Sequence, residues 1–238
     1  MSITTEKTVG QMVAENPEAA RIFEQAGIDY CCGGQRGLEE ACSQAKMSFA
    51  EVAALLEQAA AKRSASDRDW LRASQAELVE HIVSKHHGYV RQELPRLTAL
   101  IAKVKSVHGQ NHPELAPIER HFSDVSNEMT MHMMKEENIL FPYIVEMEEA
   151  VQGNGPRPIS MFGTVQNPVR MMMMEHDSAG ANLKAMRELS GDYTPPADGC
   201  TSYRVMCEAL AAFEADLHQH IHLENNILFP RAIEMEQG

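Results

Sequence analysis

The stretch HMMKEENILFPYIVEME, residues 132–148, decides the fold, because a second version of it follows later in the chain. That version is HIHLENNILFPRAIEME, residues 220–236, and the two share the pattern H-x-x-x-E-x-N-I-L-F-P-x-x-x-E-M-E. Matches at so many fixed positions indicate an internal duplication. The sequence therefore contains two related units, and their matching positions lie 88 residues apart, as from His132 to His220.

Each copy lies in a long segment with helical periodicity. We expect four long helices, at about residues 73–106, 114–149, 165–190 and 200–236. The segments between them are rich in Gly, Pro, Asn and Asp, which is typical of turns, and strand patterns are nearly absent. A duplicated helix pair packs most simply as a four-helix bundle. The sequence thus predicts an all-α fold.

The N-terminal part of the chain has a different character. We expect a small helical domain over residues 1–62, a polar, Ser-rich linker over 63–69 and the bundle over 70–238. The stretch DYCCGG, residues 29–34, falls in a turn of the small domain. Adjacent cysteines are poorly placed to bond to each other, because that disulfide closes a strained ring. Cys31 and Cys32 are therefore either small packing residues or reactive thiols.

Composition excludes some classes of partner. The chain has 21 Lys and Arg against 34 Asp and Glu, a formal charge of −13, which argues against nucleic acid and anionic membrane surfaces. No signal peptide pattern and no apolar run of about 18 residues is visible, so we expect a cytoplasmic protein without a membrane span. Its five cysteines should be mostly reduced there.

The repeated H-x-x-x-E pattern is the main candidate for chemistry. His and Glu four residues apart lie on one helix face, and a buried Glu needs a partner, for which a metal ion is well suited. A single such pair is most often structural. Two pairs in register, His132 with Glu136 and His220 with Glu224, favour metal ligands.

Each unit should add one ligand from its first helix. The third helix offers His176, and the matching residue of the first helix is His86 or His87. Pairing His87 with His176 aligns the flanking apolar positions, namely Ile82 with Met171, Val83 with Met172, Val90 with Ala179, Leu94 with Leu183 and Leu97 with Met186. We therefore choose His87 and expect His86 beside the site.

Four imidazoles and two carboxylates are too many ligands for one tetrahedral zinc ion and too rich in imidazole for calcium or magnesium. Two metal ions suit them, with the two glutamates as bridges, and mixed N and O ligands in a bundle favour iron or manganese. Positions should remain open for an oxo bridge, dioxygen, peroxide or nitric oxide. Glu128 and Glu175 either line the approach to this site or form ordinary helix ion pairs.

These motifs together resemble a known family. A hemerythrin-like domain with paired H-x-x-x-E motifs, preceded by a domain carrying DYCCGG, is similar to the repair-of-iron-centres proteins. The resemblance covers nearly the whole chain. It implies a hemerythrin-like four-helix bundle and an oxo- and carboxylate-bridged centre of two iron ions, held by His87, His132, Glu136, His176, His220 and Glu224.

The resemblance also implies a function, the repair of iron–sulfur clusters damaged by nitrosative or oxidative stress. Repair would proceed by supplying iron, with Cys31 and Cys32 as redox or transfer thiols and damaged iron–sulfur proteins as partners. Two alternatives are a nitric oxide reductase and a sensor that binds nitric oxide or dioxygen. The sequence leaves open whether the chain is an enzyme, and whether it is a monomer or a homodimer.

Overall fold

The computed structural model describes residues 7–60 and 68–238. Nearly all regular structure in these residues is helical, and their one β-type contact is an isolated bridge between Thr8 and Gly37. The expected all-α fold is confirmed. Within the same residues, no helix has the length and apolar character needed to cross a membrane. The linker predicted over 63–69 lies outside the described residues, apart from its last two.

The chain forms two compact units. Unit 1 comprises Met1–Glu80, Ile144–Gln166 and His218–Gly238. Unit 2 comprises His81–Tyr143 and Asn167–Leu217.

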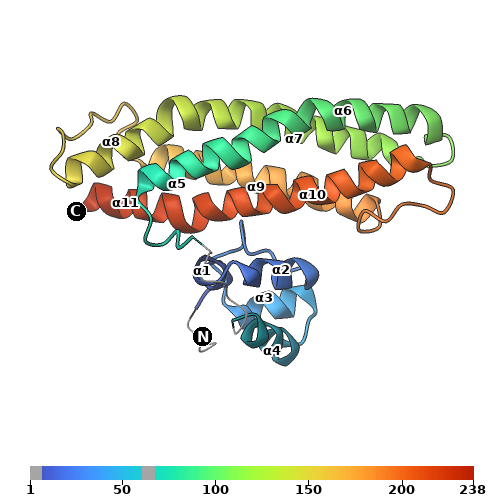
Figure 1. Ribbon diagram of the computed structural model, residues 1–238, viewed down its shortest axis with the longest axis horizontal. Helices are drawn as coiled ribbons and strands as arrows, with labels where there is room; N and C mark the ends of the chain where they lie inside the picture. Colours follow the sequence, from blue (N-terminus) through green and yellow to red (C-terminus); the bar gives the residue numbers. More distant parts are fainter. Residues whose placement is uncertain (1–6, 61–67) are drawn as a thin grey trace. The chain divides into compact units, whose positions relative to one another are not determined.

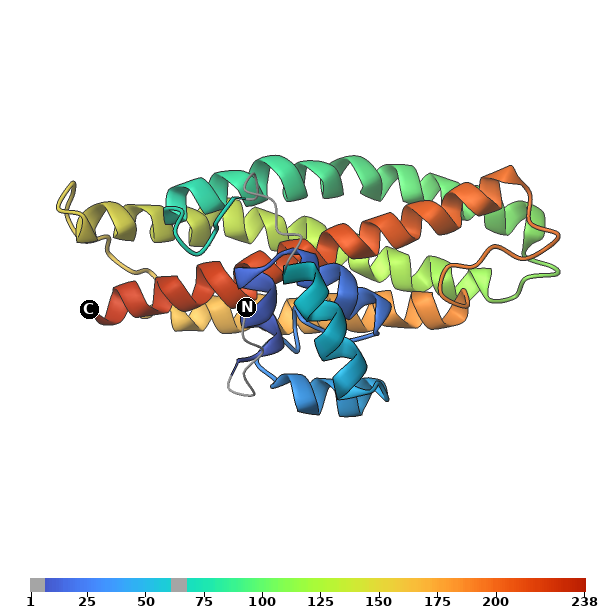
Figure 2. The same ribbon diagram turned by 60° about the horizontal axis from the view of Figure 1, so that its bottom comes forward.

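Unit 2 is a bundle of helices. They are η1 (Ile82–His87), α6 (Gly88–His108), α7 (Leu115–Lys135), η2 (Glu136–Leu140), α9 (Gln166–Leu189) and α10 (Thr201–Leu223), of which α9 begins and α10 ends in unit 1. Helices α6 and α7 are joined by a short loop and run side by side in opposite directions (Figure 1). The turned view in Figure 2 shows the same pairing.

Apolar side chains at helical spacing fill unit 2. The buried ones on α6 are Val90, Leu94, Leu97, Ile101 and Val104. Phe213 of α10 packs against Phe122 of α7, with ring centroids 5.6 Å apart, and stacks on Tyr89 of α6. The apolar positions whose spacing predicted the helices thus form one shared core, because burying them together removes apolar surface from water. The expected helical bundle is confirmed.

Unit 1 holds the N-terminal helices and the remaining ends of the long ones. They are α1 (Val9–Glu15), α2 (Glu18–Gln25), α3 (Leu38–Ala45), α4 (Phe49–Ala60), α5 (Gln75–His81), α8 (Phe141–Val151), η3 (Glu224–Leu228) and α11 (Phe229–Gln237), of which α5 ends and α8 begins in unit 2. The first four lie within residues 9–60, the part of the chain for which we expect a small helical domain (Figure 1). Helix α1 was not predicted, although Thr8 and Gln11 form a capping box at its start.

Three π-helical turns interrupt the long helices, and their positions follow the duplication. Turns η2 and η3 occupy the same place in the two repeat copies, and the Phe-Pro of the motif follows each of them at once. Proline has no backbone N–H, so it fits where regular α-helical hydrogen bonding is already interrupted. Glu136 begins η2, Glu224 begins η3 and His87 ends η1. The irregular turns therefore coincide with predicted ligands.

The last glutamate of each repeat copy caps the start of another helix within unit 1. Glu148 accepts backbone N–H bonds from Gln75 at 2.7 Å and Ala76 at 3.0 Å, at the first turn of α5. Glu236 accepts one from Val165 at 2.9 Å, just before α9. A negative charge that accepts backbone N–H groups stabilises a helix N-terminus. The motif's final carboxylate thus fixes the end of each helix pair.

Candidate metal centre

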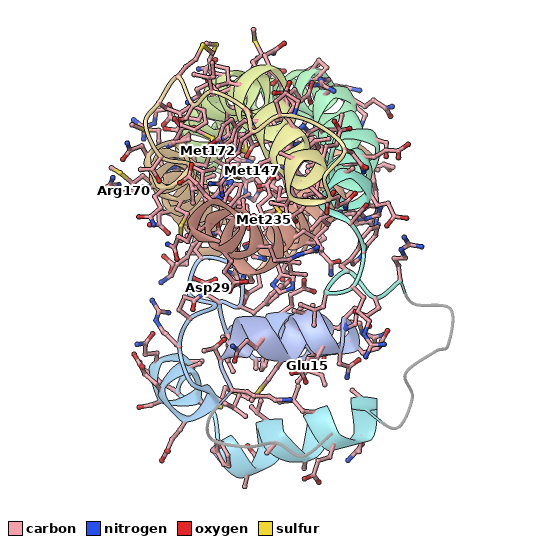
Figure 3. The ribbon with its side chains drawn as sticks, turned by 90° about the vertical axis from the view of Figure 1, so that its left-hand side faces the viewer. Glu15, Asp29, Met147, Arg170, Met172 and Met235 are labelled. Carbon is pink, nitrogen blue, oxygen red and sulfur yellow. The ribbon has the colours of Figure 1, made fainter. Side chains whose placement is uncertain are left out.

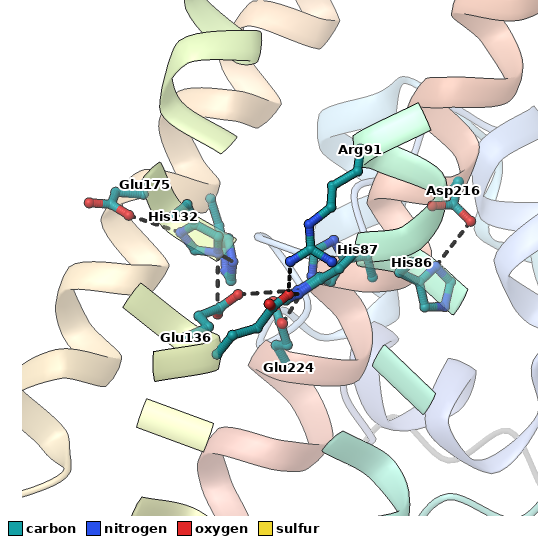
Figure 4. Close-up of polar contacts among 11 residues, drawn as sticks. His86, His87, Arg91, His132, Glu136, Glu175, Asp216 and Glu224 are labelled. Carbon is teal, nitrogen blue, oxygen red and sulfur yellow. Dashed lines mark hydrogen bonds and ion pairs between the residues drawn. The ribbon is translucent and has the colours of Figure 1, made fainter. Parts of the chain in front are cut away.

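Unit 2 brings four of the predicted ligands together in its interior. His87, His132, Glu136 and His176 have no exposed surface. The two carboxylate oxygens of Glu136 face different imidazoles, Oε2 lying 3.4 Å from Nε2 of His87 and Oε1 lying 3.2 Å from Nε2 of His132. Figure 4 shows this carboxylate between the two rings. One glutamate therefore connects two separate imidazoles.

The third imidazole of unit 2 approaches the second one. Nε2 of His176 lies 3.0 Å from Nε2 of His132, and the donor atoms of these residues and Glu136 all lie within 4.8 Å of one another. Only one of two facing ring nitrogens can carry a proton in such a contact. Once that proton is lost, two imidazole lone pairs and a carboxylate oxygen lie close together, which is a donor set typical of a metal site.

The opposite ring nitrogens are held by carboxylates. Nδ1 of His132 lies 2.9 Å from Oε2 of Glu175, and Nδ1 of His87 lies 2.6 Å from Oε1 of Glu137. The contact between His132 and Glu175 appears as a dashed line in Figure 4. An imidazole that donates its Nδ1 proton to a carboxylate presents a lone pair at Nε2. His132 and His87 are thus oriented with Nε2 toward Glu136.

Each orienting carboxylate is paired in turn with a cation. Arg91 contacts Glu137, and Lys135 contacts Glu175. Burial alone raises the pKa of Glu175, but hydrogen bonds from Lys135 and His132 outweigh it, so the pKa of that carboxyl is lowered. The pKa of Glu137 is lowered in the same way, against the effect of burial, by Arg91 and His87. Both carboxylates therefore stay ionised at neutral pH.

Unit 1 contributes the remaining predicted pair. His220 and Glu224 have no exposed surface, and Nε2 of His220 lies 3.0 Å from Oε1 of Glu224. The other histidines of this segment point elsewhere. His222 is buried, lies against the ring of Tyr30, and has its pKa lowered to about 4 by burial. His220, which the repeat pairs with Glu224, thus has different contacts from His222.

The donor chemistry of both sets fits bound metal ions. Two donor atoms that share one cation at about 2.1 Å lie about 3.0–3.4 Å apart, depending on the coordination geometry. The His–Glu and His–His distances in each unit, 3.0 to 3.4 Å, lie in that range. Buried imidazoles with a carboxylate on the far nitrogen are the usual form of metal-binding histidine.

The two glutamates predicted at the approach have different surroundings. Glu175 contacts His132 and Lys135, as described above. Glu128 accepts a hydrogen bond from the hydroxyl of Ser178 at 3.1 Å. His86, expected beside the site, is buried and lies 3.0 Å from the carboxylate of Asp216. An approach role for Glu128 and Glu175 stays a prediction.

The DYCCGG loop lies in unit 1 between α2 and α3, where Figure 3 labels Asp29. Cys31 is buried and Cys32 is half-buried, and their sulfur atoms lie 4.0 Å apart without a bond. The side chain of Asn226 holds this loop from η3, since Nδ2 donates to the carbonyl oxygens of Tyr30 at 3.3 Å and Cys31 at 3.2 Å. The cysteine loop is thus fixed to the helical turn that begins with Glu224.

Sequence reasoning singled out Glu175 only as an approach residue, and it missed Glu137 and the two cations, Arg91 and Lys135. Glu137 follows the ligand-type Glu136 directly, but the second repeat copy has Asn225 at the matching position, so the repeat gave no signal. Arg91 lies four residues after His87, one turn along the helix, and Lys135 lies three residues after His132. These spacings place cations near ligands, but they are common on solvated helix faces.

Comparison with known proteins covers both parts of the chain. Residues 78–232 match the family described as "Hemerythrin HHE cation binding domain", and residues 5–60 match one described as "Domain of Unknown function (DUF542)". The "Probable iron-sulfur cluster repair protein" of Haemophilus influenzae is 36% identical over 98% of this chain and 99% of its own.

Two further relatives are each called "Iron-sulfur cluster repair protein YtfE". The one from Pectobacterium atrosepticum is 34% identical over 97% of this chain and 98% of its own. The one from Escherichia coli O81 is 34% identical over 96% of this chain and 97% of its own. The similarity extends from the cysteine domain through the bundle. The chain therefore belongs to the iron–sulfur cluster repair family, in which a hemerythrin HHE cation-binding domain follows this N-terminal domain.

Proposed function

We propose that this protein holds two iron ions and repairs damaged iron–sulfur clusters by supplying iron. The six ligands would be those chosen from the repeat: His87, His132, Glu136, His176, His220 and Glu224. Relatives with similarity over nearly the whole chain are named iron–sulfur cluster repair proteins, which supports repair as the function here. The domains would be residues 1–62 and 70–238, joined by 63–69.

The observation that carries the proposal is the position of Glu136. Its two oxygens face different imidazoles, His87 and His132, which is the arrangement needed for a carboxylate that bridges two cations. A carboxylate serving one cation needs only one of these neighbours. The duplication supports Glu224 as the second bridge, with His220 at its side.

The described side chains have clear roles in such a centre. Glu137 and Glu175 hold His87 and His132 in the orientation that presents Nε2, and they add negative charge near a dication. Iron in this scheme is cargo delivered to a damaged cluster. Imidazole and carboxylate ligands suit iron, while thiolates compete for it, so Cys31 and Cys32 are reasonable transfer groups. Damaged iron–sulfur proteins of the cytoplasm would be the clients.

The test is reactivation of an iron–sulfur dehydratase damaged by nitric oxide. Purified iron-loaded protein is added to the damaged enzyme, with the iron content of each sample measured, and with and without a chelator of free iron. His132→Gln removes a proposed ligand. His121→Gln is the matched control, because His121 lies on the same helix and bonds to Asn182 at 2.8 Å.

We expect wild type and His121→Gln to restore activity, with loss of iron from the protein equal to iron gained by the client. His132→Gln should bind less iron and restore little activity. A fully iron-loaded wild type that restores nothing would overturn the repair proposal. Consumption of nitric oxide by that sample would then favour the reductase alternative.

A further inference from the structure

We infer that Asp29, Cys31 and Cys32 form a second kind of metal site, which takes one thiophilic divalent cation through two thiolates and one carboxylate oxygen. The three donor atoms all lie within 4.8 Å of one another. This inference deepens the transfer role proposed for the thiols. Its test measures binding alone, so it can fail while the repair function stands, and the reverse also holds.

The distance between the two sulfurs fits shared coordination. Two thiolates at about 2.3 Å from one tetrahedral cation lie about 3.8 Å apart, whereas a disulfide needs about 2.05 Å. The sulfurs of Cys31 and Cys32 lie 4.0 Å apart. A cation therefore needs only a small shift of the sulfurs, while a bond between them needs a large one.

Asp29 is placed to complete the site. Its carboxylate accepts backbone N–H bonds from Cys31 at 3.1 Å, Cys32 at 3.0 Å and Gly33 at 2.9 Å. It also accepts the thiol of Cys31, with Sγ 3.3 Å from Oδ1. Three of these bonds end on Oδ1 and only the one from Gly33 ends on Oδ2, so Oδ2 keeps one of its two lone-pair sites. The carboxylate therefore has room for a cation that both sulfurs can share, since the three donor atoms lie within 4.8 Å of one another.

The charge balance of the site also favours a cation. Two thiolates beside a carboxylate would bring three negative charges together. The pKa of the Cys31 thiol is raised well above its usual value by the contact with Cys32, by burial and by Asp29, so this thiol holds its proton when no cation is present. Binding replaces two thiol protons with one dication, and two protons leave to solvent.

The loop is held in this form before any cation binds. Asn226 donates to the carbonyls of Tyr30 and Cys31 from one side, while Asp29 holds the backbone from the other. A Cβ on Gly34 would lie 2.4 Å from Oδ1 of Asn226, so glycine is needed for this approach. Preorganised ligands lose little freedom on binding. Asp29 is exposed and Cys32 half-buried, so an ion can enter from solvent.

Cadmium is the probe, because its thiolate complexes absorb in the ultraviolet. Full-length protein with iron already loaded is titrated with Cd²⁺, and the absorption, the stoichiometry and the protons released are measured. Cys31→Ser, Cys32→Ser and Asp29→Asn test the three ligands. Cys42→Ser, a buried thiol of the neighbouring helix α3, and Cys200→Ser, an exposed thiol, are the matched controls.

We expect one Cd²⁺ per chain at the loop, with release of two protons. Either Cys31→Ser or Cys32→Ser should abolish the two-thiolate band, and Asp29→Asn should weaken binding by at least the ~10–100-fold typical of an outer-shell metal partner. Circular dichroism confirms that each variant is folded. A band that survives in Cys31→Ser or Cys32→Ser, or that disappears in Cys42→Ser or Cys200→Ser, would overturn the inference. Unchanged affinity for Cd²⁺ in folded Asp29→Asn would overturn the three-ligand site, because it would show that the Asp29 carboxylate is not a ligand.

Discussion

His132 donates from Nδ1 to Glu175, 2.9 Å away, and so presents Nε2 to Glu136 on its other side. This hydrogen bond fixes both the tautomer and the direction of the ring. His87 has the same relationship with Glu137. Two imidazoles on different helices are thus oriented by carboxylates outside the proposed set of ligands.

Glu175→Gln and Glu137→Gln should weaken iron binding by about 10–100-fold each, because the amide accepts the Nδ1 proton without the negative charge. Competition with a chelator of known affinity measures this. Glu188→Gln is the control, since Glu188 lies at the far end of α9 in an exposed pair with Lys184. If the affinity of Glu175→Gln equals that of the control, the carboxylate is only part of a surface ion pair.

Removal of iron should lower stability. A ligand that binds only the folded state, free at 100 times its Kd, adds about 2.7 kcal/mol to the free energy of unfolding. Urea denaturation of iron-loaded and iron-stripped protein measures the difference. His132→Gln should lose most of this difference, and His121→Gln should keep it. Equal midpoints for loaded and stripped wild type would contradict a buried metal centre.

Glu148→Ala and Glu236→Ala should each cost about 1 kcal/mol in the free energy of unfolding, because each leaves backbone N–H groups at a helix start without their acceptor. The same urea experiment, run without iron, gives these values. Glu149→Ala is the control, since Glu149 is exposed on the next position of α8. A cost no larger than that of the control would show that water replaces the caps.

Gly34→Ala should displace Asn226 and destabilise the protein by about 1–3 kcal/mol, as overpacking does in tight sites. The added Cβ would also meet the carbonyl oxygen of Tyr30 at 2.6 Å. Gly37→Ala is the control, because a Cβ there has nothing within 4 Å and the φ of −69° suits any residue. Similar stability of both variants would mean that the loop moves away without cost.

Cys200 should be the first thiol to react with iodoacetamide. A hydrogen bond from His108, helped by backbone N–H groups of Tyr203 and Ser202, lowers its pKa to about 7, so the thiolate forms as pH rises through 7. Burial raises the pKa of Cys207 to about 11. Mass spectrometry against pH measures the order. His108→Gln should shift the Cys200 profile to higher pH, and an unchanged profile would exclude the histidine.

The repeat predicted the helices, and all six proposed ligands are buried, because a duplicated pattern reports which positions share a face. After His87, the alignment of the first long helix with the third also predicted which side chains are buried. Val90 and Leu94 are buried, as are Ala179 and Leu183, their partners in α9. These positions follow an unbroken helical period.

Upstream of that ligand the alignment was wrong. Ile82 is buried, but Met171, aligned with it, is half exposed, and Met172 is buried instead. The cause is η1, a π-helical turn that ends at His87 and has no counterpart in α9, so the helix face shifts before the ligand. Periodicity alone does not reveal such a turn.

The role of Asn226 could not be predicted either. Its repeat partner Asn138 donates within its own helix, to the carbonyl oxygen of Met134. Asn226 instead donates to Tyr30 and Cys31, nearly two hundred residues earlier in the chain. Two copies of one motif thus share a residue but not its contacts, because only one copy meets the cysteine loop.

The caps made by Glu148 and Glu236 bear on the ancestry of the protein. Each carboxylate joins the open end of its own helix pair, opposite the connecting loop, so each pair is closed at both ends by contacts within itself. A single closed hairpin carries half of the proposed ligands. Such a hairpin would gain a complete centre by pairing with an identical copy, and fusion of two copies into one gene would then let Asn226 diverge from Asn138.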